Sequence, residues 1–465
     1  MSRLRDYSLD LISLIESGRV KTRQQLNEAK IELCKKHSVS SMPTNPTVLS
    51  FAKKRSKPLL KLLSAKPSKT LSGIAVVAVM TKPHNCPGSC IYCPSSLLKG
   101  RKTPKSYTGE EPATMRALSA NFNPRKQVRN RLEQLQEAGH STGKVELIVM
   151  GGTFLSQPVP FQRQFMLHCL NAFNARNSRN LDSAKMSCET AKTRLTGITF
   201  ETRPDFCSKP EINRMLSFGG TRCELGVQTI YDSVYERIKR GHSVQDVITA
   251  TALLKDSAFK LTYHYMPGLP GVSFSKDKSA LKRIFSSPDF RPDSLKIYPC
   301  LVIEGTELYK QWRNGLFEPI STEKAAELVS SIKSFVPRWV RIMRVQRDIP
   351  SHLIAAGVKK SNLRQIALRK AGEAGVECNC IRCREAGLRS YKENVKSSLS
   401  NARLFTENYD SSNGLERFIS FEDRKRKFLF GFLRLRQPYA PFRKEISKKT
   451  ALVRELRVFG LPMPL

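Results

Sequence analysis

A regular alternation of short apolar segments with amphipathic segments, between residue 74 and about residue 345, constrains the fold of this chain more than any other feature. The amphipathic segments have apolar residues at helical spacing, as in residues 124–138. Such alternation is typical of a parallel sheet with crossover helices, and six or seven units are fewer than the eight of a closed barrel. We therefore predict an α/β fold built on a partial (β/α) barrel. The predicted strands are residues 74–80, 145–149, 197–201, 222–227, 260–266, 294–298 and 341–345.

Three cysteines lie within eight residues, directly after the first predicted strand. Cys86, Cys90 and Cys93 have the spacing Cys-x-x-x-Cys-x-x-Cys on one tight loop. Such a loop can hold three irons of a four-iron cluster and leave the fourth iron open for a ligand. Radical S-adenosylmethionine enzymes use an open iron of this kind to bind the cofactor and to break its carbon–sulfur bond. The alternative is a zinc knuckle with His84 as fourth ligand, although zinc sites usually have four ligands at paired spacings.

Glycines and polar residues follow the ends of the next three strands. Gly151 and Gly152 would let the backbone approach the amino group of a bound methionine. Glu201 and Arg203 could hold the ribose hydroxyls and the carboxylate of the same cofactor, and Gln228 ends the fourth strand. A glycine turn and a strand-end ion pair are the ordinary alternatives. Because carboxyl ends of parallel strands meet at one edge of a sheet, the motifs together predict a single active-site mouth.

The charge of the chain indicates a polyanionic partner. The 465 residues carry 79 Lys and Arg against 40 Asp and Glu, a net charge of +39. This surplus favours nucleic acid over a membrane surface, because no apolar run approaches the ~20 residues that span a bilayer. The N-terminus also lacks the apolar core of a secretory signal. We expect a cytoplasmic protein whose twelve cysteines are reduced thiols or metal ligands.

The first 70 residues are markedly basic, with a cluster at Lys53, Lys54, Arg55 and Lys57. A solvated, mobile tail is one interpretation of such a segment. We favour a basic arm that follows phosphates, because neighbouring acidic residues do not balance its charge.

A second cysteine group, Cys378, Cys380 and Cys383, lies far downstream. Three soft ligands at the spacing Cys-x-Cys-x-x-Cys favour a structural zinc ion that needs a fourth ligand. His352 is the nearest upstream candidate, and a histidine with no metal role is the alternative.

Longer blocks of the sequence resemble the catalytic subunit of Elongator, and most of all its stand-alone archaeal form. The resemblance runs from about residue 20 to the last residue. The blocks that carry it are MTKPHNCPGSCIYCPSS, SYTGEEPATMRA, VELIVMGGTF, GITFETRPD, LGVQT, RGHS, LKIYPCLVIEGTELY and VRIMRVQRDIPSHLIAAGVKKSNLR.

The resemblance implies four segments. They are a basic tRNA-binding segment (1–70), a radical S-adenosylmethionine domain (71–350), a small zinc-binding linker (351–395) and a GNAT-type α+β acetyltransferase domain (396–465). It also implies an enzyme that carboxymethylates carbon five of the wobble uridine in tRNA. Such an enzyme uses a 5′-deoxyadenosyl radical and the acetyl group of acetyl-CoA, and it requires an electron donor.

By the same resemblance, several residues acquire expected roles. Cys86, Cys90 and Cys93 hold the cluster, with the methionine end of the cofactor facing Gly151, Gly152 and Thr153. Lys296 and Tyr298 are expected as catalytic residues near the substrate. The residues expected to contact acetyl-CoA are Lys144, Glu455, Leu456, Arg457 and Val458.

The sequence departs from the family after RELRVFG, where it ends in LPMPL instead of a glycine-rich turn that would cradle the CoA pyrophosphate. We therefore expect an incomplete acetyltransferase domain, whose remainder is either a separate polypeptide or lost. The alternative functions are a tRNA-binding scaffold or decayed copy with a structural cluster, and a protein acetyltransferase. The missing loop argues against the latter.

Overall fold

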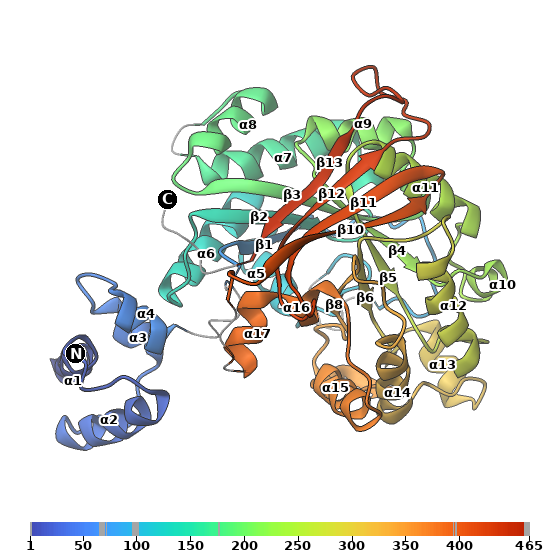
Figure 1. The fold of residues 1–465 in the computed structure, drawn as a ribbon. Coiled ribbons are helices and arrows are strands. Elements are labelled where there is room, and N and C mark those ends of the chain that lie inside the picture. Colours follow the sequence, from blue (N-terminus) through green and yellow to red (C-terminus); the bar gives the residue numbers. More distant parts are fainter. Residues whose placement is uncertain are drawn as a thin grey trace.

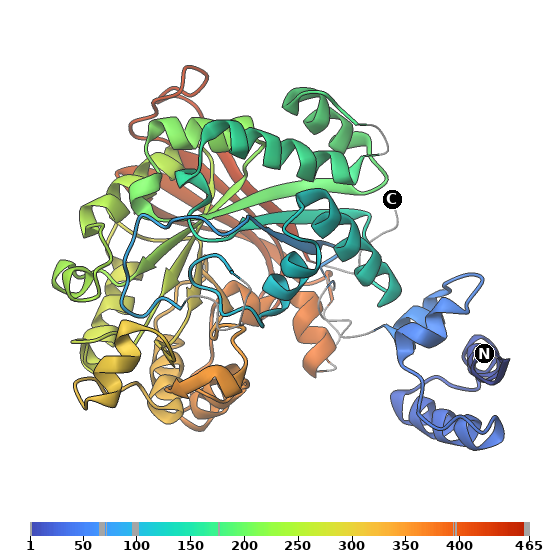
Figure 2. The ribbon, with the colours of Figure 1, turned by 180° about the vertical axis from the view of Figure 1, so that it is seen from behind.

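The computed structural model describes residues 2–64, 70, 72–94, 102–174, 177–393, 395 and 398–459 (Figures 1 and 2). Its centre is a parallel sheet of seven strands whose spatial order equals their order in the chain, as in a partial barrel. The predicted fold is confirmed, and each predicted strand is present. The strands are β1 (Ala75–Met80), β2 (Lys144–Met150), β3 (Arg194–Thr202), β4 (Arg222–Gln228), β5 (Lys260–Tyr265), β6 (Ser294–Ile297) and β8 (Arg341–Arg344).

The outer face of this sheet is apolar and is covered by the crossover helices. Val77 pairs with Leu147, and Val149 pairs with Phe200, all completely buried. Residues with alternate direction on the central strands are polar, as in Arg222 and Glu224 of β4. The helices are α5 (Pro112–Ser119), α6 (Pro124–Glu137), α7 (Val159–Phe173), α8 (Leu181–Thr190), α9 (Lys209–Ser217), α10 (Asp232–Arg237), α11 (Val244–Asp256), α12 (Phe274–Ser286), α13 (Glu307–Arg313) and α14 (Thr322–Ile332).

Short elements complete this part of the chain. The pair β7 (Val302–Ile303) and β9 (Ile354–Ala356) forms a small antiparallel sheet. The other elements are the 3-10 helices η2 (Phe154–Ser156), η3 (Pro204–Phe206) and η4 (Ser351–Leu353), and the helices α15 (Leu363–Glu373), α16 (Ile381–Arg384) and α17 (Ala386–Glu393).

The basic N-terminal segment is a helical unit with its own core. Tyr7, Leu11, Val48 and Leu59 are buried together in it. In both ribbon views the unit stands to one side of the body (Figures 1 and 2). Its helices are α1 (Ser2–Glu16), α2 (Arg23–Lys36), α3 (Asn45–Ser50) and α4 (Lys57–Leu63). None of the described helices is both long enough and apolar enough to cross a membrane.

The C-terminal part is an antiparallel sheet of four strands in chain order. Figure 1 shows this sheet, in red, lying across the parallel strands. Ser412 and Asn413 have positive φ angles of 49° and 60° and form the tight turn of its first hairpin. The strands are β10 (Ala402–Ser411), β11 (Gly414–Asp423), β12 (Leu429–Gln437) and β13 (Leu452–Val458).

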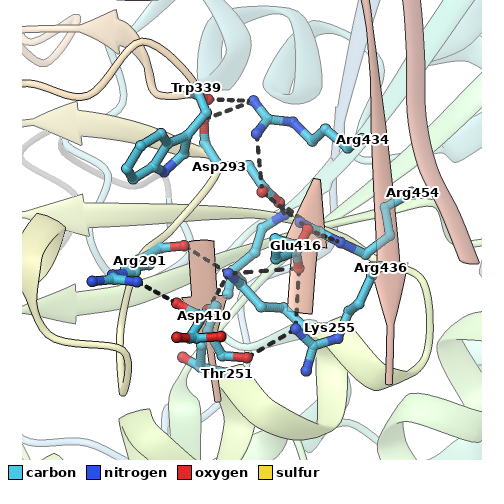
Figure 3. A network of polar contacts seen from close by, with 12 residues as sticks. Thr251, Lys255, Arg291, Asp293, Trp339, Asp410, Glu416, Arg434, Arg436 and Arg454 are labelled. Atoms are coloured by element: carbon cyan, nitrogen blue, oxygen red, sulfur yellow. Dashed lines mark hydrogen bonds and ion pairs between the residues drawn. The ribbon is translucent and has the colours of Figure 1, made fainter. Parts of the chain in front are cut away.

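Buried charges join the two sheets (Figure 3). Arg454 of β13 donates to both carboxylate oxygens of Asp293 at 2.7 Å, directly before β6. Arg454 also donates to Glu416 of β11 at 2.8 Å, and Arg436 of β12 donates to Asp256 at the end of α11. Asp293, Arg436 and Arg454 have no side-chain exposure to solvent. The antiparallel sheet is therefore fixed at the amino-terminal ends of the parallel strands.

We predict that Asp293→Asn lowers the free energy of unfolding by about 3–5 kcal/mol, because it leaves Arg454 buried without its counter-ion. Burial opposes the charged form of Asp293, but Arg454 and Arg434 outweigh it and hold the pKa well below its ordinary value. The contribution is therefore present above the unfolded pKa of about 3.9 and is lost as the pH falls below it. Urea unfolding at pH 7 measures the effect. Asp182→Asn, at an exposed ion pair with Lys185, serves as control and should leave the midpoint unchanged; equal stability of the two variants would contradict the prediction.

Candidate active site

An open cavity of about 800 Å³ lies at the carboxyl ends of the parallel strands. It brings together residues from the cysteine loop and from the ends of β2, β3 and β4, as the sequence predicted. The predicted site residues that line it are Cys86, Cys90, Cys93, Gly152, Thr153, Glu201, Arg203, Gln228 and Tyr298.

The cysteine loop is fixed by backbone hydrogen bonds and by an arginine. Ile91 donates to the carbonyl of Ile238, and Cys93 donates to the carbonyl of Cys90, at 3.1 and 3.0 Å. Arg240 donates to Cys90 Sγ at 3.4 Å and to the carbonyl of Gly226. Burial, together with the neighbouring Cys90, raises the pKa of the Cys93 thiol to about 11. A loop of three thiols beside a fixed cation suits a cluster whose thiolate charge needs compensation.

A zinc knuckle fits this loop less well. The described residues contain one compact cysteine group, and it is the downstream one, so the sulfur atoms of Cys86, Cys90 and Cys93 are more widely spaced than one zinc ion requires. His84 Nε2 lies 3.3 Å from the carbonyl of Thr153 and 3.5 Å from Ser156 Oγ. The geometry favours separate irons over a single shared ion.

The two glycines after β2 have backbone conformations that disfavour other residues. Gly151 has φ +115° and Gly152 has φ +78°. A Cβ atom on Gly151 would lie 2.8 Å from Thr81 Oγ1, and one on Gly152 would lie 3.3 Å from the ring of His84. Gly151 itself packs behind the cavity, and its carbonyl accepts a hydrogen bond from Thr81 at 3.1 Å. The turn thus places the backbone of Gly152 and Thr153 at the cavity.

Arg203 is buried with one donor unused. Asp205 accepts hydrogen bonds from its Nε and Nη2, both at 2.9 Å. Nη1 is buried and has no hydrogen-bond partner. It lies close to Gly88 of the cysteine loop, where a Cβ atom would be 2.1 Å from it. An orphaned cationic donor beside the cysteine loop suits an anionic ligand such as a carboxylate.

Gln228 also has an unused polar atom. Its Oε1 is buried without a partner, and its backbone has φ +67°, a strained conformation for this residue type. The carbonyl of Gln228 accepts a hydrogen bond from Met266 at 2.8 Å, which holds the strained turn at the end of β4.

A charged cavity floor was missed by the sequence analysis. Glu224 is completely buried, accepts from Arg222 at 2.7 Å, lies 2.8 Å from His264 Nε2 and pairs with Lys296. Burial opposes its ionisation, but Lys296 and Arg222 outweigh burial and hold the pKa of Glu224 well below its ordinary value. The detectable signal was a charged residue at alternate positions of a strand that is otherwise buried on both faces, as in RCELGVQ.

Lys296 lies beneath the cavity rather than on its surface. Its ammonium pairs with Glu224 and lies 3.5 Å from Glu201, and both carboxylates line the cavity. Burial alone would lower the pKa of Lys296, but Glu224 raises it above its ordinary value. Tyr298 lines the cavity directly, with its ring 5.4 Å from that of His264.

The downstream cysteines form a compact group that suits zinc. The sulfur atoms of Cys378, Cys380 and Cys383 all lie within 4.8 Å of one another, and tetrahedral zinc sulfurs are about 3.8 Å apart. His352 is not brought to them. It is exposed in η4, and its Nε2 lies 2.8 Å from the carboxylate of Glu110.

The residues expected to contact acetyl-CoA lie away from the cavity, at the amino-terminal edge of the sheet. Lys144 is the first residue of β2 and is exposed. Glu455 of β13 pairs with Lys260 and accepts from Arg434 at 3.0 Å, so its carboxylate is already used. Although burial opposes it, Lys260 lowers the pKa of Glu455 to about 2. Leu456 and Val458 are 72% and 74% exposed, whereas Arg457 is half-buried.

Comparisons with known proteins agree with this architecture. Family models match the chain over residues 7–71 (ELP3 N-terminal domain), 80–284 (Radical SAM superfamily) and 292–372 (Radical_SAM C-terminal domain). The chain is 50% identical to the tRNA uridine(34) acetyltransferase of Methanocaldococcus infernus over 96% of its own length and 84% of the relative. It is 40% identical to Elongator complex protein 3 of Homo sapiens over 100% of its length and 86% of the relative.

A solved structure, the archaeal Methanocaldococcus infernus Elp3 with an N-terminal deletion, resembles this fold with a TM-score of 0.75 at 49% identity. The match covers 84% of each chain. These similarities confirm the resemblance seen in the sequence, and the chain belongs to the family that contains Elongator complex protein 3 and the archaeal tRNA uridine(34) acetyltransferases.

Proposed function

We propose that this chain modifies the wobble uridine of tRNA by radical chemistry. The observation that carries the proposal is one open cavity in which the three cysteines of a single loop meet Gly152, Glu201 and Arg203. Relatives that align with nearly the whole chain are named for uridine 34 of tRNA or for Elongator. The net charge of +39 suits an RNA substrate.

The cavity residues are suited to hold S-adenosylmethionine. A four-iron cluster on Cys86, Cys90 and Cys93 would supply the electron that cleaves the cofactor. The unpaired Nη1 of Arg203 is available to donate to the methionine carboxylate, and Glu201 to accept from ribose hydroxyls. Three further residues offer backbone or amide groups to the cofactor: Gly151, Gly152 and Gln228. Thr153 extends the same turn.

With acetyl-CoA as co-substrate, the product is a carboxymethyl group on carbon five. The acetyl methyl gives up one hydrogen atom, and the uracil ring gives up one proton and one electron as the carbon–carbon bond forms. Hydrolysis of the thioester then releases CoA. Tyr298 is the proposed catalytic residue on the cavity surface, and burial raises its pKa, so the phenol stays protonated and able to donate. Lys296 acts as a fixed charge below it.

We also propose the division into segments 1–70, 71–350, 351–395 and 396–465, with tRNA bound by the first and zinc by the third. Lys144 and the strand Leu452–Val458 would contact acetyl-CoA. The exposed apolar side chains of Leu456 and Val458 are suited to pack against further acetyltransferase structure, such as a separate polypeptide. A cytoplasmic electron donor would reduce the cluster.

Cys90→Ala should abolish 5′-deoxyadenosine formation by anaerobically reconstituted protein that is given reductant, S-adenosylmethionine, acetyl-CoA and tRNA, because one iron loses its ligand. Cys34→Ala, in the N-terminal unit, is the matched control and should keep full activity. If wild-type protein with a loaded cluster and normal tRNA binding makes no 5′-deoxyadenosine, the reaction is contradicted and a tRNA-binding scaffold is favoured.

Cys380→Ser should remove about one zinc ion per chain and lower the midpoint of thermal unfolding, because it deletes a ligand from the compact group. His352→Ala should keep its zinc, because its ring faces Glu110 rather than the cysteines. Metal content is measured by mass spectrometry after dialysis. Zinc loss in the histidine variant would show that the geometry changes when the metal binds.

Neutral replacement of Lys53, Lys54, Arg55 and Lys57 with Gln should weaken tRNA binding about tenfold or more at moderate salt, because these exposed side chains add positive charge to one loop. The dissociation constant is measured at several salt concentrations. An unchanged affinity and salt dependence would exclude this loop from the RNA interface.

A further inference from the structure

A second open cavity, of about 870 Å³, lies beside the downstream cysteine group and is lined by parts of α15 and α17. Its lining is strongly basic. Five cationic side chains line it, but only two carboxylates do, Glu377 and Glu393. The cationic residues are Lys333, Arg364, Arg382, Arg389 and Lys392.

The two carboxylates are already engaged by one arginine. Arg389 donates to Glu393 at 2.8 Å and lies 3.8 Å from Glu377. Glu377 also pairs with Lys427 at 3.0 Å. The cavity therefore holds no carboxylate that is free to balance its other cations.

Three of the cations have no partner in the part of the chain that the structure describes. Lys333, Arg382 and Lys392 form no side-chain hydrogen bond and no ion pair within 4.0 Å there, and Arg364 donates only to the carbonyl of Ile342. Lys333 is 3% exposed. Keeping an ammonium group so deeply buried without a counter-ion is costly.

The neighbouring cysteines do not supply enough negative charge. Three thiolates on one divalent zinc ion would carry a single net negative charge. That charge leaves at least two of the cations Lys333, Arg382 and Lys392 unbalanced. The cavity therefore favours an additional anion from outside the chain.

The cavity also adjoins the basic N-terminal unit. Arg23, the first residue of α2, donates to the hydroxyl of Tyr391 in α17 at 3.4 Å. Tyr391 directly precedes Lys392, which lines the cavity. A polyanion that contacts the N-terminal unit can therefore continue onto α17 and reach the cavity.

We propose that this cavity is a phosphate-binding site for the RNA backbone, formed by Lys333, Arg364, Arg382 and Lys392. The site deepens the proposed function, because the RNA is the tRNA on which that function depends. It would hold the body of the RNA at a point separate from the cysteine cavity, where the uridine is modified.

The test compares the full chain carrying Arg382→Gln and Lys392→Gln with a matched control carrying Lys278→Gln and Lys282→Gln, two exposed lysines of α12. Dissociation constants for tRNA are measured between 50 and 300 mM KCl. The cavity variant should bind about tenfold more weakly, and its plot of log affinity against log salt should lose a slope of about 0.7–0.9 per lost phosphate contact. The control should match wild type in both. Zinc content and the midpoint of thermal unfolding verify that both variants are folded.

A folded cavity variant with the affinity and salt slope of the control would overturn the site. The phosphates of CoA are tested in a parallel titration with CoA and inorganic phosphate. If the variant loses CoA binding but keeps tRNA binding, RNA is not the occupant and the proposal is also overturned. If the variant loses tRNA binding as expected while wild-type protein forms no modified uridine, the phosphate site stands and the proposed reaction fails.

Discussion

The buried contact between Asp293 and Arg454 is the interaction on which the arrangement of the two sheets depends (Figure 3). Asp293 precedes β6 and also accepts a hydrogen bond from the backbone of Leu261 in β5 at 2.8 Å. One carboxylate thus joins two parallel strands to the antiparallel sheet. Around it, Glu416 and Arg436 complete a network without solvent access, in which each charge depends on its neighbours. Because the network occupies the amino-terminal edge, the carboxyl edge stays open for the cavity.

The polar interior of the half-barrel connects that network with the cavity. Glu455 of β13 pairs with Lys260 at the start of β5, while Arg222, at the start of β4, bonds to Glu224 at the cavity floor. A sheet with an apolar interior would give the cavity no fixed charge. Here the outer face carries the hydrophobic core, so charged side chains are free to occupy the inner face, where every buried ion has a counter-ion. The scaffold therefore supplies both stability and the electrostatics of the site.

The two cysteine groups show how spacing and context select different chemistry. Cys378, Cys380 and Cys383 are close enough to share one ion, whereas Cys86 and its partners are spread along a loop that faces an open cavity. The first arrangement suits a closed structural centre, and the second suits a centre that must leave room for a ligand. The basic cavity beside the compact group gives that part of the chain a proposed role in holding RNA, in addition to its role in the fold.

Much of this protein could be read from its sequence, because strand and helix periodicity, the cysteine spacings and the glycine turn after β2 are local properties. They determined the parallel sheet, the site at its carboxyl edge and the residues Cys86, Gly152 and Glu201. The sequence could not reveal Glu224 as the cavity floor or Arg240 as the partner of Cys90, because these contacts join residues far apart in the chain. Nor could it show that His352 faces Glu110 instead of the cysteines. Only the tertiary structure decided which charges are buried together, since the pairing of an ion depends on packing in space and not on its neighbours in sequence.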